Sequence, residues 1–111
     1  MEVDRLVHEP ARLSILSQLY VVAEADFLFV MQQAQLTQGN LSSHLAKLDE
    51  AGYVEVQKGF VGKRPRTVLR ITPKGQRALE QYVASMRQVL NDVPVKKSGR
   101  VRRAKLMPAR A

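Results

Sequence analysis

The adjacent residues Ser43 and His44 are of the types that hydrolases use as nucleophile and general base. The surrounding sequence predicts a helix, in which successive side chains diverge by about 100°, so the two cannot form a nucleophile–base pair. The sequence also has no Gly-x-Ser-x-Gly motif. The two histidines, His8 and His44, lack the number and spacing of a metal site, and there is no cysteine. We therefore expect no enzymatic activity, no metal and no other cofactor.

The segment that begins at Thr37 has residues suited to contact with nucleic acid. Thr37 is a good N-cap for a helix over 37–51, and Leu41, Leu45 and Leu48 form its apolar stripe. The opposite face is small and polar near its start, which allows a helix to approach base edges closely, and the free N–H groups there favour a phosphate. The candidate DNA-contacting residues of this helix are Thr37, Gln38, Gly39, Asn40, Ser42, Ser43, His44 and Lys47.

Each of these assignments has an alternative. The whole face can be a solvated polar surface. His44 can contact the nucleic acid, or it can be a packed, hydrogen-bonded histidine. Gly39 costs about 1 kcal/mol relative to alanine in a helix, so it needs a reason, which is either close approach to a phosphate or tight packing on the preceding helix. Glu50 is expected to point away from the nucleic acid, since phosphate would repel it.

A second candidate element is a basic segment between two predicted strands, 53–56 and 67–71. It contains two glycines and a proline, which predict a hairpin loop over 58–66, and the apolar Phe60 and Val61 interrupt its polarity. A basic hairpin beside a DNA-contacting helix reaches phosphates or the minor groove. The candidate DNA-contacting residues of this hairpin are Lys58, Lys63, Arg64 and Arg66.

The distribution of charge supports a polyanionic partner. The chain of 111 residues has a net charge of +8. Residues 1–55 have a net charge of −5, residues 56–91 of +7 and residues 92–111 of +6. Clustered cations gain free energy by releasing counterions from phosphates, although the charge can also serve only solubility. The chain has no apolar run long enough to cross a bilayer and no signal-peptide pattern, so we expect a cytoplasmic protein without a membrane partner.

These elements together predict one domain over 1–93, followed by a basic, disordered tail over 94–111. Helices are predicted over 9–22, 27–33, 37–51 and 73–93, with a short connection between the second and the third. The expected fold is mainly α with a small β-hairpin, a winged helix-turn-helix in the order α-α-α-β-β-α. The last helix has a wide apolar seam that a second subunit can cover, and packing on the first helix is the alternative. The residues of this candidate dimer interface are Leu79, Tyr82, Val83, Met86, Val89 and Leu90.

The sequence resembles short winged helix-turn-helix transcriptional regulators related to the MarR and ArsR families. The resemblance rests on residues 8–16, 36–45, 48–54, 64–67 and 69–75, which match the opening helix, the helix-turn-helix, the wing and the start of the last helix. It implies sequence-specific transcriptional regulation by a homodimer, with the 37–51 helix in the major groove and the wing on the backbone. Metal sensing of the ArsR type is not expected without cysteines, and an effector site cannot be assumed in a chain this short.

The sequence therefore predicts a homodimeric transcriptional regulator that binds double-stranded DNA. Two alternatives remain open: a winged-helix interaction module for RNA or protein, and a DNA-coating protein without a preferred operator. The salt dependence and sequence preference of duplex binding separate the three.

Overall fold

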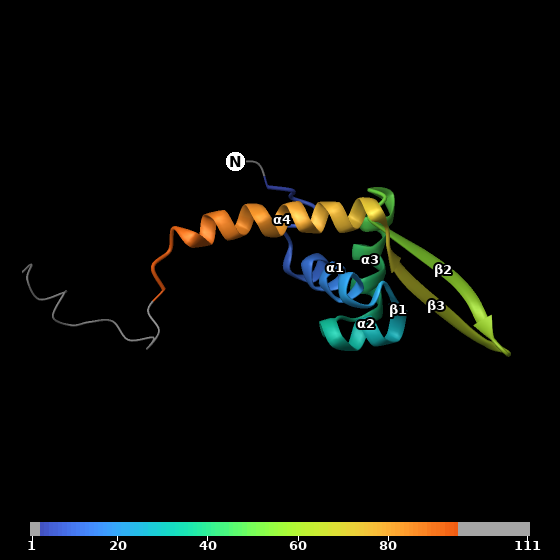
Figure 1. Ribbon diagram of the computed structural model, residues 1–111. Helices are drawn as coiled ribbons and strands as arrows, with labels where there is room; N and C mark the ends of the chain where they lie inside the picture. The colour runs from blue at the N-terminus through green and yellow to red at the C-terminus, as the bar shows by residue number, and fades with distance from the viewer. Residues whose placement is uncertain (1–2, 96–111) are drawn as a thin grey trace, which may run out of the picture.

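All four predicted helices and the predicted hairpin are present, in the predicted order (Figure 1). The computed structural model describes residues 3–95. Its elements are α1 (Pro10–Val22), β1 (Glu24–Asp26), α2 (Phe27–Ala34), α3 (Gln38–Glu50), β2 (Val54–Val61), β3 (Arg64–Ile71) and α4 (Pro73–Asn91). The bounds of the helices agree with the predicted ones to within two residues, so the winged helix-turn-helix class is confirmed.

Each helix begins at a side chain that accepts a hydrogen bond from a backbone N–H in the first turn. Thr37 has this role in α3, where its Oγ1 accepts from the N–H of Asn40 at 3.1 Å. Thr72 does the same for α4, and a proline occupies the first position of α1 and of α4. Gly52, just after α3, has a φ of +80°, as expected for a glycine that ends a helix.

The sheet differs from the prediction, because it has a third strand. β1 pairs antiparallel with β3, so the strand order is β1-β3-β2. The sequence analysis predicts no strand at residues 24–26, which lie between the first two predicted helices. A strand of three residues is too short to show a period of two in the sequence, which is why the pattern did not reveal it. Asp26 also caps α2, because its carboxylate accepts a hydrogen bond from the N–H of Leu28 at 2.8 Å.

The hairpin strands are also longer than predicted. The segment 58–66, expected as a loop, is mostly strand, with Gly62 and Lys63 alone forming the turn. Gly62 has a φ of +63°, and Lys63 is not among the residues with positive φ, which matches a type II′ turn. The prediction was wrong because it required alternating apolar residues. A two-stranded ribbon exposed on both faces has no buried side to produce that alternation.

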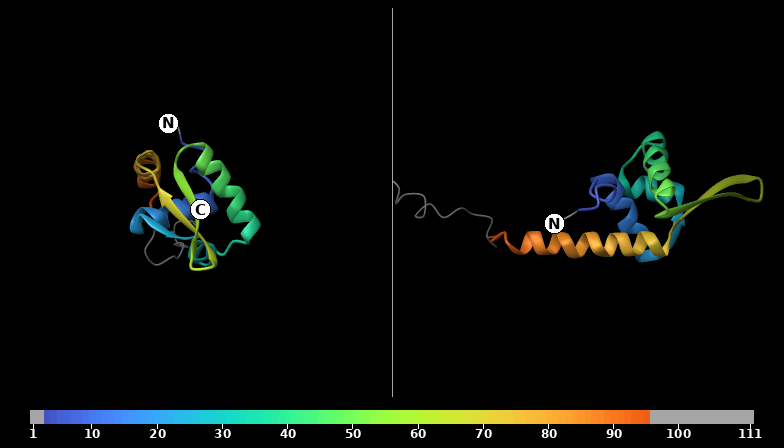
Figure 2. Two further views of the ribbon diagram at one scale, coloured as in Figure 1. Left: turned by 90° about the vertical axis from the view of Figure 1, so that its right-hand side faces the viewer. Right: turned by 90° about the horizontal axis from the view of Figure 1, so that it is seen from above.

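The core lies where α1, α3, α4 and the base of the hairpin meet. The apolar stripe of α3 is buried as predicted, since Leu41, Leu45 and Leu48 are at most 3% exposed. The other buried core residues are Val7, Ile15, Leu16, Leu19, Val30, Val54, Leu69, Ile71, Ala78, Leu79 and Tyr82. The hairpin extends from this body at one end, and the far end of α4 extends at the other (Figures 1 and 2). Among residues 3–95, no helix combines the length and apolarity needed to span a membrane.

Candidate nucleic-acid interface

The polar side of α3 faces solvent. Of the eight residues predicted to contact DNA from this helix, all except His44 are exposed. The capping bond from Thr37 fixes the first turn, and the buried leucines hold the opposite side of the helix against the core. The exposed side is therefore available to a ligand and is held in a defined orientation.

His44 is partly buried and hydrogen-bonded. Its Nδ1 lies 3.3 Å from Nη1 of Arg12, and the Nε of Arg12 donates to the carbonyl oxygen of Leu6 at 2.7 Å. Glu9 lies beside this group, and the backbone N–H of Arg12, which donates to its carboxylate, lowers the pKa of Glu9. Of the two alternatives for His44, the structure shows the packed, hydrogen-bonded histidine.

Gly39 has open space on its outer side. A Cβ added at this position would meet no atom within 4 Å outside its own helix and chain neighbours. Tight packing on the preceding helix therefore does not explain the glycine. Close approach of a phosphate, the other reason considered from the sequence, stays a prediction.

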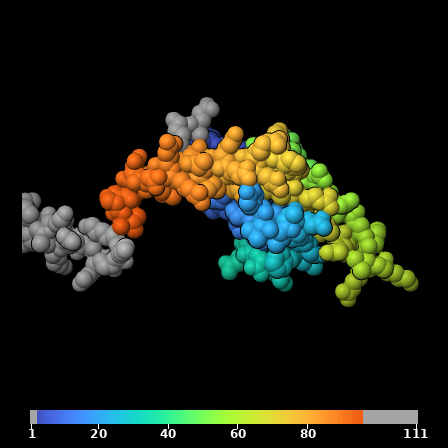
Figure 3. Space-filling model, in the orientation of Figure 1, coloured from blue at the N-terminus to red at the C-terminus, as the bar shows by residue number. Residues whose placement is uncertain are grey.

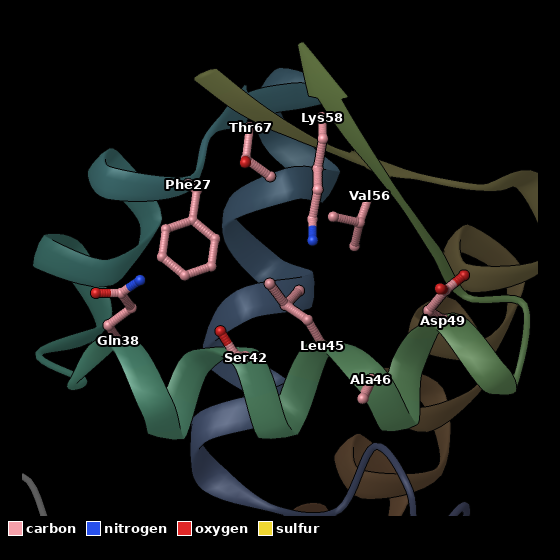
Figure 4. Close-up of a pocket in the computed structure, with 9 residues that line it drawn as sticks. All are labelled: Phe27, Gln38, Ser42, Leu45, Ala46, Asp49, Val56, Lys58 and Thr67. Atoms are coloured by element: carbon pink, nitrogen blue, oxygen red, sulfur yellow. The ribbon is translucent and has the colours of Figure 1, made fainter. Parts of the chain in front are cut away.

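An open groove of about 780 Å³ lies between α3 and the hairpin (Figure 4). Gln38 and Ser42 line it from α3, and Lys58 lines it from β2 with its side chain directed toward α3. The other lining residues are Phe27, Leu45, Ala46, Asp49, Val56 and Thr67. Of the residues predicted to contact DNA, Gln38, Ser42 and Lys58 thus face one common space, whereas the other predicted residues do not line it.

Several of these groove residues were missed from the sequence. Ala46 and Asp49 follow Ser42 at helical spacing, so the spacing alone could have placed them on the same side of α3. Glu50 was considered instead, and Asp49 is the acidic residue that lines the groove. Thr67 lies opposite Lys58 in the hairpin, a pairing that can be found only once the turn at Gly62 is known.

The four predicted hairpin cations do not lie on one face. Alternation along the strands places Lys58 on the groove face and Arg64 and Arg66 on the other. The Nε of Arg66 donates to Asp26 at 3.2 Å, in an ion pair that ties the hairpin to the start of α2. Within residues 3–95, no ion pair is found for Lys58, Lys63 or Arg64.

Arg70, which was not among the predicted site residues, has a structural role on this outer face. Its guanidinium donates to Glu24 at 2.6 Å and lies 3.6 Å from Glu55. The hydrogen bond to Glu24 raises the pKa of Arg70. Arg66 therefore pairs with an acidic residue of β1, and Arg70 pairs with one of β1 and one of β2.

The apolar seam of α4 divides into two parts. Leu79 is 5% exposed and Tyr82 is 8% exposed, because both pack into the core of their own chain. Both therefore have the packing within the chain that was considered as the alternative, and Leu79 also lines a groove between α1 and α4. Their place in a dimer interface stays a prediction. Val89 and Leu90, further along α4, are 40% and 58% exposed. Val83 and Met86 are partly buried between these two groups.

Comparison with known proteins agrees with this geometry. A family model described as a winged helix DNA-binding domain matches residues 11–90. The chain belongs to this family. This winged helix domain is 33% identical, over 89 residues, to the uncharacterized protein MJ0432 of Methanocaldococcus jannaschii, and the match covers 80% of the chain and 97% of that relative.

Solved structures share the fold of this winged helix domain. A transcriptional regulator homologue from Pyrococcus horikoshii OT3 is 30% identical with a TM-score of 0.77, over 83% of this chain and 91% of that one. A MarR family transcriptional regulator from Silicibacter pomeroyi has a TM-score of 0.65 at 15% identity, over 86% and 63% of the two chains. The resemblance to MarR and ArsR regulators stated from the sequence is confirmed at the level of the fold, and the winged helix DNA-binding family is confirmed by the family model.

Proposed function

We propose that this winged helix domain is a transcriptional regulator that binds a preferred duplex DNA sequence as a homodimer. The observation that supports the proposal best is the groove between α3 and the hairpin, onto which small polar residues and an unpaired lysine both open. A surface of this kind combines base-edge contacts with phosphate contacts. The family match makes double-stranded DNA the expected ligand.

In this proposal α3 enters the major groove by its N-terminal half. Gln38 and Asn40 have amides that can each make a bidentate contact with adenine, and Ser42 and Ser43 are short enough to reach either kind of base pair. Gly39, with open space above it, lets the backbone N–H groups of the first turn approach a phosphate. Lys47, one turn beyond Ser43, neutralises a phosphate at the groove edge.

The hairpin supplies phosphate contacts beside α3. Lys58 is directed into the shared groove, and Lys63 and Arg64 lie at or next to the turn. Arg66, which was predicted with them, is instead assigned to bracing the hairpin against Asp26. The 94–111 segment, of which residues 96–111 lie outside the described part of the chain, is proposed to follow the 1–93 domain as a basic tail that adds unspecific phosphate contacts.

The homodimer is proposed to form through the exposed end of α4 and the neighbouring face of α1. A groove of about 480 Å³ lies between these helices, lined by Tyr20, Val21 and Val83 among others. Val21 is 82% exposed, and with Val89 and Leu90 it offers apolar area that residues 3–95 leave uncovered. Two α3 helices about 34 Å apart in such a dimer would read an inverted repeat.

Selection of bound sequences from a random duplex pool tests this function. We expect the selected sites to have two-fold symmetry and to bind roughly a thousandfold more tightly than random duplex at the same salt concentration. Asn40→Ala and Ser43→Ala are expected to reduce that ratio, because they remove contacts with bases. Strong binding without sequence preference would indicate a DNA-coating protein, and no duplex binding would leave the interaction module.

A further inference from the structure

The outer half of the hairpin stands clear of the rest of the molecule. Residues 57–66 are all exposed, and β1 pairs with β3 only at residues 68–70 (Figure 3). Apart from the ion pair of Arg66 with Asp26 at its inner end, this outer half is therefore held by pairing of its two strands. Its side chains are not needed to cover the core, so their types reflect another role.

Two apolar residues lie at this exposed end among cations. Phe60 is 73% exposed and Val61 is 58% exposed, and neither belongs to the core cluster. Lys58 precedes them, and Lys63 and Arg64 follow. A phenyl group in water at the end of a cationic ribbon fits a ligand that offers apolar surface between anionic groups, which is the composition of a duplex groove bordered by phosphates.

The strand register places Phe60 on the same face as the α3 groove. Lys58 pairs with Thr67, and both line that groove, while Phe60 pairs with Pro65 two residues further out. Residues two apart in a strand share a face, so Phe60 continues the groove face about 7 Å beyond Lys58. Val61, its neighbour, lies on the opposite face.

Pro65 gives Phe60 a rigid support. The proline ring fixes the backbone φ. Because proline has no N–H to donate, Phe60 and Pro65 form a non-hydrogen-bonded pair of the antiparallel ladder. At such a position the facing side chains are at their closest. The type II′ turn at Gly62 fixes the register that brings these two residues together.

We propose that Phe60 is an apolar wedge that enters the minor groove of duplex DNA beside the major groove occupied by α3. This inference depends on the proposed DNA binding. It names Phe60 as a further contact with the duplex and bending of the duplex as the result. The ring packs on sugars and base edges and partly unstacks one base step, while Lys58, on the same face, and Lys63, at the turn, hold the flanking phosphates. Apolar side chains inserted in this way bend the duplex toward the major groove, so the complex is expected to contain bent DNA.

The test compares Phe60→Ala with Val61→Ala on a duplex taken from the random-pool selection. Both residues are exposed and apolar and are adjacent in sequence, but only Phe60 lies on the groove face. We expect Phe60→Ala to weaken binding about tenfold, the scale of one aromatic contact with a base. Val61→Ala is expected to change the affinity less than about twofold. Phe60→Leu is expected to retain most of the binding, because a wedge requires apolar bulk.

Two further measurements separate a wedge from a general loss of binding. Energy transfer between dyes at the two ends of the duplex reports bending, and we expect the bend to decrease with Phe60→Ala and to persist with Val61→Ala. The salt dependence of the affinity is expected to stay the same for both, because neither removes a charge. Thermal unfolding of each variant checks that the fold is retained.

Three outcomes would overturn the wedge. Equal affinities and equal bends for Phe60→Ala and the wild type would remove Phe60 from the interface while leaving the proposed DNA binding intact. Equal losses for Phe60→Ala and Val61→Ala would show that the hairpin end has no distinct groove face. Absence of duplex binding by the wild type would overturn the proposed function together with the wedge.

Discussion

Tyr53, three residues beyond the end of α3, joins three parts of the chain. Its hydroxyl donates to Asp4 at 2.6 Å, and its carbonyl oxygen accepts from the N–H of Thr72 at 3.0 Å. Asp4 also accepts from the N–H of Leu6 at 2.9 Å, so this carboxylate fixes the N-terminal segment as well. One residue thereby holds the end of α3, the start of α4 and the beginning of the chain in fixed positions.

The hydroxyl of Tyr53 makes stability depend on pH in the alkaline range. The hydrogen bond to Asp4 and burial raise its pKa from 10.0 to about 12. Because the folded state holds the proton more tightly, this contribution is complete below pH 10 and is lost as the pH rises from 10 to about 12. We expect Tyr53→Phe to lower the free energy of unfolding by about 1 to 2 kcal/mol at neutral pH. Denaturant unfolding at pH 7 and pH 11 measures both effects, and an equal deficit at both pH values would contradict the assignment.

The hairpin cations are expected to differ in their effect on DNA binding. Lys63→Ala removes an unpaired charge next to Arg64 and is expected to lower the slope of log Kd against log salt by about 1. Arg66→Ala is expected to change the slope by much less, because its guanidinium is already paired with Asp26. Titrations at several salt concentrations give both slopes. Equal changes would mean that Arg66 leaves Asp26 to bind a phosphate.

At the scale of elements, the glycines in the first turns of α3 and α4 differ in their surroundings. A Cβ at Gly75 would collide with the carbonyl oxygen of Tyr53, whereas Gly39 has open space. We expect Gly75→Ala to cost about 3 kcal/mol or more, because the obstacle is backbone, and Gly39→Ala to add up to about 1 kcal/mol. Thermal unfolding measures both. The same Gly39→Ala variant is expected to bind DNA less tightly, and unchanged affinity would contradict close approach at this position.

The elements that the sequence predicted well are those with local signals. Capping residues, prolines at helix starts and the leucine stripe of α3 all act within a few residues, so the helix bounds could be read directly. The expectation that the basic hairpin lies beside this helix agrees with the groove that α3 shares with Lys58.

What the sequence could not show depends on contacts between distant residues. β1 exists because residues 24–26 meet 68–70, and the pairing of Arg66 with Asp26 follows from that meeting. Leu79 and Tyr82 looked the same as Val89 and Leu90 in the periodic pattern of α4. Only the position of α1 decides which of them are covered, and the amino-acid pattern of α4 alone does not contain that information.

At the scale of the whole molecule, α4 extends well past the body that it helps to cover (Figure 2). Its buried residues all lie between Gly75 and Tyr82, while Leu90 near its end is 58% exposed. We expect Leu90→Glu to raise the dimer dissociation constant about a hundredfold, because a symmetric interface would bury one unpaired carboxylate from each subunit. Sedimentation equilibrium measures this dissociation constant. Leu28→Glu is the matched control, since Leu28 is 59% exposed on α2. Equal weakening by both, or by neither, would place the dimer interface elsewhere.

Because the outer hairpin covers no core, its length is free to change without cost to the rest of the fold. The number of residues added to each strand must be even to keep the same side chains on the groove face. Inserting one residue in each strand, placed symmetrically about the Gly62 turn, carries the tip further out but turns its side chains over, whereas inserting two in each restores the original orientation. We therefore expect hairpins lengthened by two residues per strand to retain DNA binding. Hairpins lengthened by one residue per strand are expected to lose it, because Val61 then takes the place of Phe60 on the groove face.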